Sequence, residues 1–477
     1  MTQPRATTAH PFWNGTTLAS VALTSMAATV AIHEITGATW TWIPGGVALI
    51  LGFVVPQWRA LVPAARALAM IALGMGIALP SLGLITVDTL HRALDQALYF
   101  AFFVVMLGIL QDTAAQSPMI RRSGAVLLAQ PPGRRYSVLT LGGMQMGVLL
   151  NLGTLSLLGT MIAQGVAQGR AASGDRIAEI RLRRMSLAML RGFCTVPLWS
   201  PTSISMPIVL AALPGLHWLD ILPYGATAAL MLLGLGWMLD RLSYKRPLAP
   251  PAPAAWLRPL LPLLALIATI PSVGFAVSAV LDLRMISGIL IAIPLIALTW
   301  QTIQHRGRAH PRPMRAAARA LVVETLPKLP SFRSEMVIFA TSGAIAIMIL
   351  PLIDVTALGA GIAALGLGEG LVMVAGFLCI VLMAFVGVNS IVTVSVLMGV
   401  LPNLPGFDFV PIQLALMALL GWTVSVGVSP LSAAVRITAR SIGQEASTLG
   451  LRWNLVYTTA AAALIILALL LAAALTP

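Results

Sequence analysis

Long apolar runs separated by short polar stretches make up most of the sequence. A helix needs about 20 mainly apolar residues to cross a membrane, and runs of that order recur along the whole chain. They predict an all-α polytopic membrane protein with about eleven transmembrane helices, two of them interrupted. The expected crossings are residues 17–32, 43–55, 67–85, 97–110, 185–213, 224–239, 260–280, 285–300, 336–352, 410–437 and 453–475.

The apolar stretch 138–167 does not fit a simple crossing, because basic residues flank it on both sides. Short loops rich in arginine stay on the cytoplasmic side, so both of its ends are expected there. Its roughly 30 residues are too few for two crossings, which favours a re-entrant hairpin with its tip near Asn151. The alternative is one long tilted helix with one basic run on the wrong side. The flanking residues are Arg121, Arg122, Arg134, Arg135, Arg170, Arg176, Arg181, Arg183 and Arg184.

A second apolar stretch, 371–401, has the same character but opposite flanks. It carries Asn389, Ser390 and Thr393 in its middle, and the short segments on either side contain no Arg or Lys. By the same rule its ends are expected outside the cell. It therefore predicts a second hairpin that enters the membrane from the opposite side.

Two crossings are predicted to break at proline. Proline removes a backbone donor and clashes with the preceding turn, so a helix usually breaks there. Residues 185–213 are interrupted around the sequence SPTS at 200–203, and residues 410–437 around SPLS at 429–432. One such motif alone is most simply a kink. Two of them, each following a hairpin with a central asparagine, indicate a built site.

The two halves of the sequence share one order of elements: crossings, a hairpin, a broken helix and a final crossing. The flanks of the two hairpins give the halves opposite orientations in the membrane, which predicts two inverted-topology repeats. Matching broken helices in inverted repeats point to the substrate site of a carrier. The predicted boundaries are a first repeat at 1–245, a Pro/Ala-rich linker at 246–258, and a second repeat at 259–477 with a basic cytoplasmic loop at 301–334.

Hairpin tips and helix breaks supply the candidate site. A broken helix offers free N–H groups and its positive dipole end to an anion, and free carbonyl groups to Na⁺. Neutral amides and hydroxyls add donors and acceptors without the cost of a buried charge. The candidate substrate-binding residues are Asn151, Gly153, Thr154, Ser200, Pro201, Thr202, Ser203, Asn389, Ser390, Thr393, Ser429, Pro430 and Ser432. A sodium site is expected near Asn151, Thr154, Asn389 and Ser390.

Composition supports a membrane protein and disfavours several other classes. The chain has 58% hydrophobic and 9% charged residues, whereas a soluble domain has about 25% charged residues. Its net charge of +14 comes from basic residues between the apolar runs, which indicates topology rather than nucleic-acid binding. The two cysteines lie in apolar segments and predict no disulfide framework. No histidine falls in the middle of an apolar segment, which disfavours a metal site.

The positions of charged and amide side chains relative to the apolar segments limit which transport mechanisms are expected. None of the fifteen Asp and Glu residues lies in the middle of a segment, so no proton relay is offered. This disfavours proton antiport and, without convergent Asp, His and Cys groups, a membrane-embedded enzyme. Arg191 and Arg436 are either anion contacts or interfacial anchors, and the anchor is the simpler interpretation. Gln145 is expected in a helix–helix hydrogen bond.

The sequences LNLGT at 150–154 and VNSIVT at 388–393 lie at the expected hairpin tips. Together with the order of elements, they resemble the ion transporter superfamily, in particular the divalent anion/sodium symporters and the citrate and arsenite carriers. That resemblance implies an elevator-type transporter. It would be a homodimer with a static scaffold and a mobile transport domain that holds both hairpins and both broken helices. It also implies that sodium and a substrate carboxylate bind at the hairpin tips.

The sequence therefore predicts a secondary active transporter, not an enzyme, that moves a small organic anion of carboxylate type by alternating access. Sodium symport and exchange are both open. The alternatives are a cation or metalloid-oxyanion exporter of the same fold, and the membrane subunit of a tripartite transporter that uses a solute-binding protein. The expected partners are the bilayer and a second copy of the chain, with no nucleic acid and no cofactor besides Na⁺. The expected location is a bacterial-type cytoplasmic membrane, with the N-terminus inside and the C-terminus outside.

Overall fold

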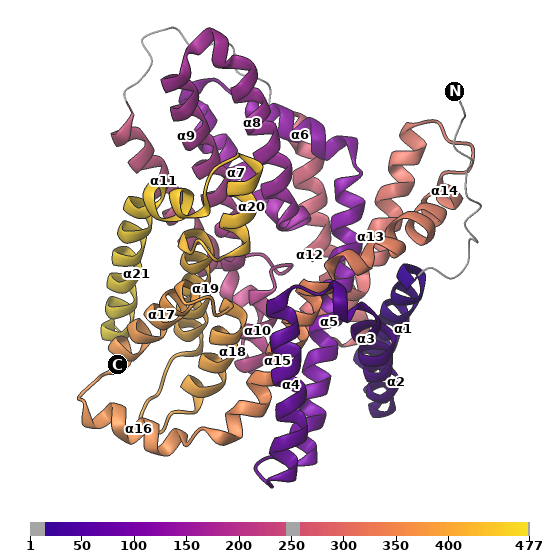
Figure 1. Ribbon diagram of the computed structural model, residues 1–477, viewed down its shortest axis with the longest axis vertical. Coiled ribbons are helices and arrows are strands. Elements are labelled where there is room, and N and C mark those ends of the chain that lie inside the picture. The colour runs from indigo at the N-terminus through magenta and orange to yellow at the C-terminus, as the bar shows by residue number, and fades with distance from the viewer. Residues whose placement is uncertain (1–14, 245–257, 476–477) are drawn as a thin grey trace. The chain divides into compact units, whose positions relative to one another are not determined.

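The computed structural model describes residues 15–244 and 258–475, and the regular structure in these ranges is helical (Figure 1). Within the described ranges, ten helical segments are long and apolar enough to cross a membrane, or eleven if one pair bent by 114° counts as a span. The prediction of an all-α polytopic membrane protein is confirmed at this level. The expected cytoplasmic N-terminus and almost all of the linker 246–258 lie outside the described residues.

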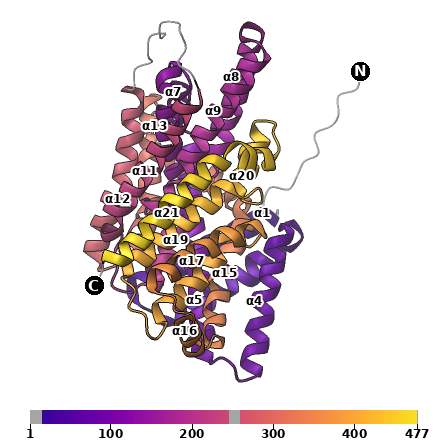
Figure 2. The ribbon, with the colours of Figure 1, turned by 90° about the vertical axis from the view of Figure 1, so that its left-hand side faces the viewer.

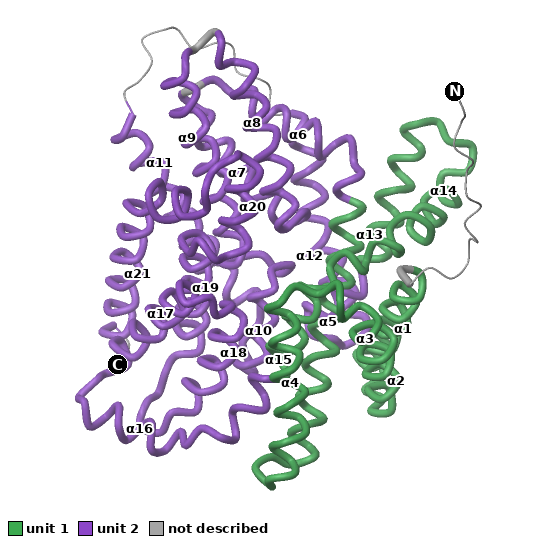
Figure 3. The backbone as a smooth tube through the Cα atoms, in the orientation of Figure 1, with its two compact units in different colours: residues 1–113, 293–344 green, residues 114–292, 345–477 purple. Residues whose placement is uncertain are grey.

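The chain forms two compact units, each built from two stretches of sequence (Figure 3). Unit 1 contains residues 1–113 and 293–344, and unit 2 contains residues 114–292 and 345–477. The predicted halves 1–245 and 259–477 therefore do not coincide with the units, because each half contributes to both. Unit 2 holds both predicted hairpins and both predicted broken helices.

Unit 1 is built from helices that are close-packed through small residues. A Cβ atom on Gly52 would lie 2.8 Å from the Ala22 Cβ, and one on Gly343 would lie 2.6 Å from the Phe100 ring. Such close approach favours van der Waals packing between apolar helices. Its main helices are α1 (Gly15–Thr36), α2 (Trp42–Val47), the π-helix η2 (Ala48–Val54), α3 (Val55–Gln57), α4 (Pro63–Ser81) and α14 (Pro313–Ala320), together with most of α5 (Val87–Ala115), α13 (Met285–Gly307) and α15 (Arg333–Ile349).

The basic stretch 301–334, predicted as a loop, is mostly helical. α13 continues into it, α14 follows, and the π-helix η6 (Leu321–Thr325) and the 3₁₀ helix η7 (Leu326–Phe332) lead into α15. Leu329 is buried, and the Lys328 Nζ atom lies 3.0 Å from an Asp112 carboxylate oxygen. The apolar residues between the arginines give this stretch a face to bury, which explains why it is not an open loop.

Unit 2 contains two runs of helices. The first run is α6 (Pro118–Leu128), α7 (Pro132–Leu150), α8 (Gly153–Ser173), α9 (Asp175–Cys194), the 3₁₀ helix η4 (Val196–Leu198), α10 (Ser205–Ala212), α11 (Trp218–Ser243) and α12 (Leu261–Leu281). The second is α16 (Val355–Ala364), α17 (Glu369–Phe385), α18 (Ser390–Val400), α19 (Pro411–Val428), α20 (Ala433–Ser441) and α21 (Leu455–Leu475). α16 is the helix that bends sharply against α17.

The two runs pack on one another in a reciprocal way. Figures 1 and 2 show α7, α8 and α9 side by side, and likewise α17, α19 and α21. Across the runs, α8 packs against α20, and α18 packs against α10. Both arms of each hairpin thus contact its own broken helix, and the second arm also contacts the short half-helix of the other run.

Glycines let these helices approach closely. A Cβ on Gly192 in α9 would lie 1.9 Å from the Thr140 carbonyl oxygen of α7, and one on Gly143 would lie 2.6 Å from the Met189 carbonyl oxygen. Gly159 in α8 meets Ser441 at the end of α20 in the same manner, with 2.1 Å to its Oγ atom. The backbone of the first hairpin is therefore in direct contact with the broken helix beside it.

Candidate functional site

The first hairpin turns at Asn151 and Leu152, between α7 and α8. Asn151 has a φ of 47°, a backbone conformation that asparagine tolerates better than most residues. Thr154, one turn further on, is fully buried, and its Oγ1 atom has no hydrogen-bond partner among the described residues. Gly153 is exposed at the start of α8.

The first helix break is held together by hydroxyl groups and is bonded to this hairpin. The Ser200 and Thr202 hydroxyls lie 2.9 Å apart, and the Ser203 and Ser205 hydroxyls 2.8 Å apart. The Thr202 Oγ1 atom also donates to the Val148 carbonyl at 3.1 Å, just before the hairpin turn. The break and the turn thus form one hydrogen-bonded assembly.

The second hairpin turns at residues 386–389, with Gly387 at a φ of 92°. Asn389 is exposed and caps α18, since its Oδ1 atom accepts from the Ile391 N–H at 3.0 Å. Ser390 is buried, and its hydroxyl lies 2.9 Å from that of Ser425 in α19. Thr393 is buried, with its Oγ1 atom unpartnered within the described ranges.

The second break repeats the arrangement of the first. Ser429 is fully buried and donates to the Ala384 carbonyl at 2.6 Å. Ala384 lies near the end of α17, the first arm of the second hairpin. Ser432 caps α20 by accepting from the Val435 N–H at 3.2 Å, and it donates to the Val426 carbonyl at 2.7 Å. Hydroxyl caps of this kind satisfy the donors that a helix leaves free at its start.

The two breaks lie against one another. η4, inside the first break, packs on α19 just before the second break. A Cβ atom on Gly427 would lie 3.2 Å from the Cys194 Sγ atom, and these two residues immediately precede the breaks in their helices. No hydrogen bond joins Asn151 to Asn389 in the described part of the chain, so the candidate residues meet through the breaks rather than through the two asparagines.

A cavity of about 280 Å³ lies beside the first break. Pro201 and Thr202 line it from the break, and Trp199 and Trp218 contribute aromatic faces. Gln145, expected in a helix–helix hydrogen bond, instead lines this cavity, and its Oε1 atom is buried without a partner among the residues described. The Trp199 Nε1–H is likewise buried and unpartnered. The remaining lining residues are Val148, Leu222, Leu264, Ile267, Ala268, Ile270 and Pro271.

This lining is typical of a small-molecule site. Such pockets are mainly hydrophobic and aromatic, with a few polar groups that orient the ligand, and have volumes of about 300–1,000 Å³. The indole N–H can only donate, whereas the amide can donate and accept. The cavity can therefore hold a compact solute with an apolar body and at least one hydrogen-bond acceptor.

Arg191 lies in α9, one turn before the first break, and its side chain is buried. Only 7% of the residue is exposed, whereas an interfacial anchor would leave the guanidinium outside. Its Nε atom donates to the Asn454 Oδ1 atom at 2.9 Å, and a terminal nitrogen donates to the Tyr136 hydroxyl at 2.9 Å. Asn454 in turn donates to the Gly427 carbonyl at 3.1 Å, next to the second break. Arg191 therefore links the first hairpin arm to both broken helices.

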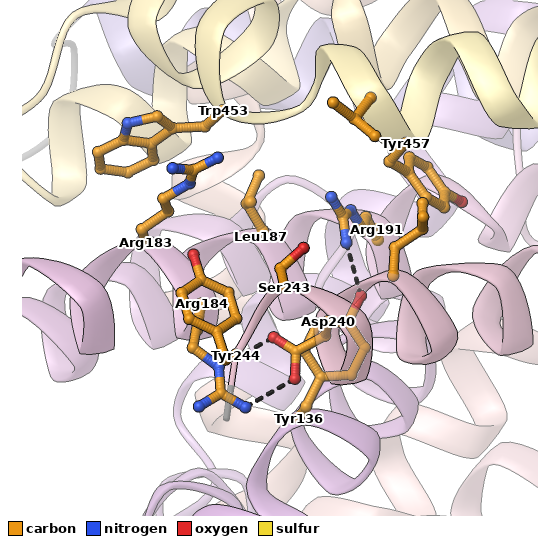
Figure 4. Close-up of a pocket in the computed structure, with 12 residues that line it drawn as sticks. Tyr136, Arg183, Arg184, Leu187, Arg191, Asp240, Ser243, Tyr244, Trp453 and Tyr457 are labelled. Atoms are coloured by element: carbon orange, nitrogen blue, oxygen red, sulfur yellow. Dashed lines mark hydrogen bonds and ion pairs between the residues drawn. The ribbon is translucent and has the colours of Figure 1, made fainter. Parts of the chain in front are cut away.

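Arg191 lines a second, smaller pocket of about 80 Å³ (Figure 4). Arg183, Arg184 and Trp453 line it together with Arg191. Figure 4 shows the Arg183 side chain beside Trp453, and Arg191 beside Tyr457. The pocket thus combines three guanidinium groups with aromatic rings.

Further basic residues crowd the base of the first hairpin. Burial, and after it the nearby Arg181 and Arg184 guanidinium groups, lower the pKa of Arg135 from its ordinary value. Like charges in this proximity repel one another, so an anion would be attracted to this end of the hairpin.

Arg436, the other arginine that the sequence singles out, is exposed on α20. Tyr136, Asn454 and Tyr457 were missed by the sequence analysis because they belong to α7 and to the region around the start of α21. No local motif marks them. Only the fold brings them to Arg191.

Comparison with known proteins leaves the chain without a family assignment. No protein-family model and no curated protein matches the sequence. Among the solved structures, 16 chains match. One is the YdaH transporter of Alcanivorax borkumensis, with 14% identity, 78% of this chain and 85% of that chain covered, and a TM-score of 0.44. That structure is described as having an unusual topology.

In the Ser429→Ala variant we expect a loss of about 1–3 kcal/mol in stability, because the buried Ala384 carbonyl and the Leu431 N–H both lose their hydroxyl partner. The thermal midpoint of the purified protein measures this. Ser156→Ala is the matched control, since Ser156 is exposed on α8 and makes no side-chain hydrogen bond in the described structure. Equal midpoints for the two variants would contradict the hydrogen bond between the second helix break and the second hairpin.

Proposed function

We propose that this chain is a secondary active transporter that moves a small organic anion across the membrane by alternating access. The observation that carries the proposal is the meeting of two broken helices in unit 2, each hydrogen-bonded to its neighbouring hairpin turn. Non-helical backbone in a membrane protein persists where it is buried or lines a cavity, and carriers use paired breaks for substrate and ions. A purely structural membrane protein has no need of such breaks in duplicate.

The cavity beside the first break supports an organic rather than an inorganic anion. Most of its wall is tryptophan and aliphatic side chains, which would bury an apolar body favourably. The unpartnered Trp199 Nε1–H can donate to a carboxylate oxygen, and the Gln145 amide can orient it. A strongly hydrated inorganic oxyanion would lose its water in such a wall without enough donors to replace it.

We further propose that sodium couples the transport, and that the chain is a divergent relative of the ion transporter superfamily. Thr154 and Thr393 support the sodium site, because each has a buried hydroxyl oxygen without a described partner near a hairpin turn. Hard cations prefer such oxygen ligands. The division into two compact units, with both hairpins in unit 2, supports an elevator in which unit 2 moves against a scaffold formed by unit 1 in a homodimer.

The proposal is tested by the thermal midpoint of the purified protein in the presence of benzoate, hexanoate, succinate or sulfate, each as the sodium and the potassium salt. A ligand that binds only the folded state stabilises it by about 2.7 kcal/mol at a concentration 100-fold above its Kd. We expect a carboxylate with an apolar body to raise the midpoint, and to raise it further as the sodium salt.

Two variants localise the effect without damaging the turns. Asn151→Gly keeps the positive φ at the first turn, and Asn389→Ser keeps a capping oxygen at the start of α18. Both remove an amide at the proposed sodium site, so the additional shift with the sodium salt is expected to shrink while the midpoint without ligand stays close to wild type. A shift from metal cations or oxyanions alone would instead favour the exporter alternative.

A further inference from the structure

Arg191 is a buried cation whose described direct contacts are all neutral. Its described contacts are the Asn454 amide oxygen, the Tyr136 hydroxyl and the Tyr457 ring, which lies 4.3 Å from the guanidinium carbon. No ion pair of Arg191 is found in the described part of the chain. A charge removed from water is costly unless it is paired, so this arginine lacks the partner that buried arginines normally have.

The acid in the pocket does not fill this role. Asp240 is buried there, but Arg184 holds both of its oxygens, at 2.9 Å and 2.6 Å. This two-pronged pairing occupies the carboxylate and neutralises Arg184. Arg183 and Arg191 are left as positive groups that the pocket residues do not balance.

Arg183 is the second such group. Its Nε atom is buried and has no hydrogen-bond partner among the described residues. Figure 4 shows the Arg183 and Arg191 side chains along the same wall of the pocket, beside Trp453 and Tyr457. The pocket volume of about 80 Å³ lies between α7, α9, α11 and the start of α21.

We propose that this pocket binds one anionic group, a carboxylate or a phosphate, between Arg183 and Arg191. The planar guanidinium presents paired donors that match both kinds of oxygen anion. A bound anion would neutralise the buried charge and accept from the nitrogens that the protein leaves free. The inference goes beyond the proposed function, since this site is separate from the cavity at the first break and binding here requires no transport.

The same chemistry can come from a free anion or from a lipid headgroup. The basic residues at the hairpin base belong to the side that the arginine pattern places in the cytoplasm, where both are available. Nanodiscs separate the two sources. Phosphatidylcholine has no net charge, so its headgroup should compete only weakly with an added anion, whereas the anionic phosphatidylglycerol should compete strongly.

The test uses calorimetric titration of the full chain in phosphatidylcholine nanodiscs with sodium acetate and with inorganic phosphate. The key variant is Asn454→Asp, which places a carboxylate of nearly the same size 2.9 Å from the Arg191 Nε atom. This internal anion should satisfy the arginine. We expect the affinity for the added anion to fall by about tenfold or more. The same change removes the amide that donates to the Gly427 carbonyl, so the thermal midpoint without ligand serves to show that the variant is folded.

Two further variants make the result specific. Arg183→Gln removes the second cation and is expected to weaken binding by a similar factor. Arg241→Gln is the matched control, because Arg241 lies on α11 over the Trp237 ring and does not line the pocket. It should keep the wild-type affinity. If Asn454→Asp binds as tightly as wild type, or if neither added anion nor phosphatidylglycerol occupies the wild-type pocket, the proposal is overturned.

The outcome is independent of transport. If anions bind here with this pattern while no solute is transported, the pocket stands and the proposed function fails. If transport is observed while the pocket binds nothing, the reverse holds.

Discussion

In the Gly192→Ala variant we expect a large loss of stability, because the new methyl group would lie inside the backbone of α7. The added Cβ would lie 1.9 Å from the Thr140 carbonyl oxygen and 3.1 Å from the Met144 nitrogen. Overpacking a core typically costs about 1–3 kcal/mol and occasionally more. Since the obstacle is backbone, which cannot change rotamer, we expect about 3 kcal/mol or more, measured as a lowered thermal midpoint.

The displacement should also reach the anion pocket. Gly192 follows Arg191, and the Tyr136 hydroxyl that accepts from Arg191 belongs to α7. Any separation of α7 from α9 therefore breaks this contact. Gly165→Ala in α8 is the control, because a Cβ there meets nothing within 4 Å and alanine favours the helix by up to about 1 kcal/mol. If both variants are as stable as wild type, the close packing of α7 on α9 is wrong.

The second large effect is expected from Ala268→Phe on α12. Ala268 lines the cavity beside the first break, and an aromatic ring at this position would occupy part of its roughly 280 Å³. We expect the carboxylate-dependent midpoint shift and any solute uptake to fall by about tenfold or more. The midpoint without ligand should change little, because the ring enters existing space.

Ala265→Phe provides the comparison on the same helix. Ala265 is exposed and does not line the cavity, so the same added ring should leave ligand binding unchanged. Wild-type ligand response in Ala268→Phe would show that the solute does not use this cavity. Loss of response in both variants would point instead to a general disturbance of α12.

Local chemistry explains what could be predicted from the sequence. The turn at Asn151 lies inside the predicted hairpin range 138–167, and the helix interruptions fall at the predicted SPTS and SPLS motifs. Proline, asparagine and the arginine-rich flanks act on the few residues around them, so their effects can be predicted from the sequence alone. The helical fold class follows from the apolar runs for the same reason.

Long-range packing explains what could not be predicted. Arg191 and Asn454 are 263 residues apart in the sequence, and no motif near either residue predicts their contact. The interface-anchor interpretation of Arg191 assumed that a long basic side chain reaches water, which holds only where neighbours do not cover it. Likewise, Gln145 faces a cavity whose wall also includes residues of α11 and α12, a property of the assembled unit.

The division into units shows the same limit. The halves 1–245 and 259–477 follow from the repeated order of elements, whereas the units follow from which helices bury one another. Residues 301–334 illustrate the point, because the arginines there predict a solvated loop while Thr325, Leu329 and Pro330 are buried in unit 1. The distribution of charges predicts on which side of the membrane a segment lies, whereas packing against other helices determines whether that segment is a loop or a helix.

Counterflow in proteoliposomes tests the central claim most directly. Vesicles preloaded with unlabelled benzoate, hexanoate or succinate are diluted into a trace of the same radiolabelled anion, with sodium on both sides. The account predicts transient accumulation of at least one of these anions above equilibrium, retained in Ala265→Phe and lost in Ala268→Phe. Folded wild-type protein that accumulates none of them, with uptake no faster than empty vesicles, would contradict it.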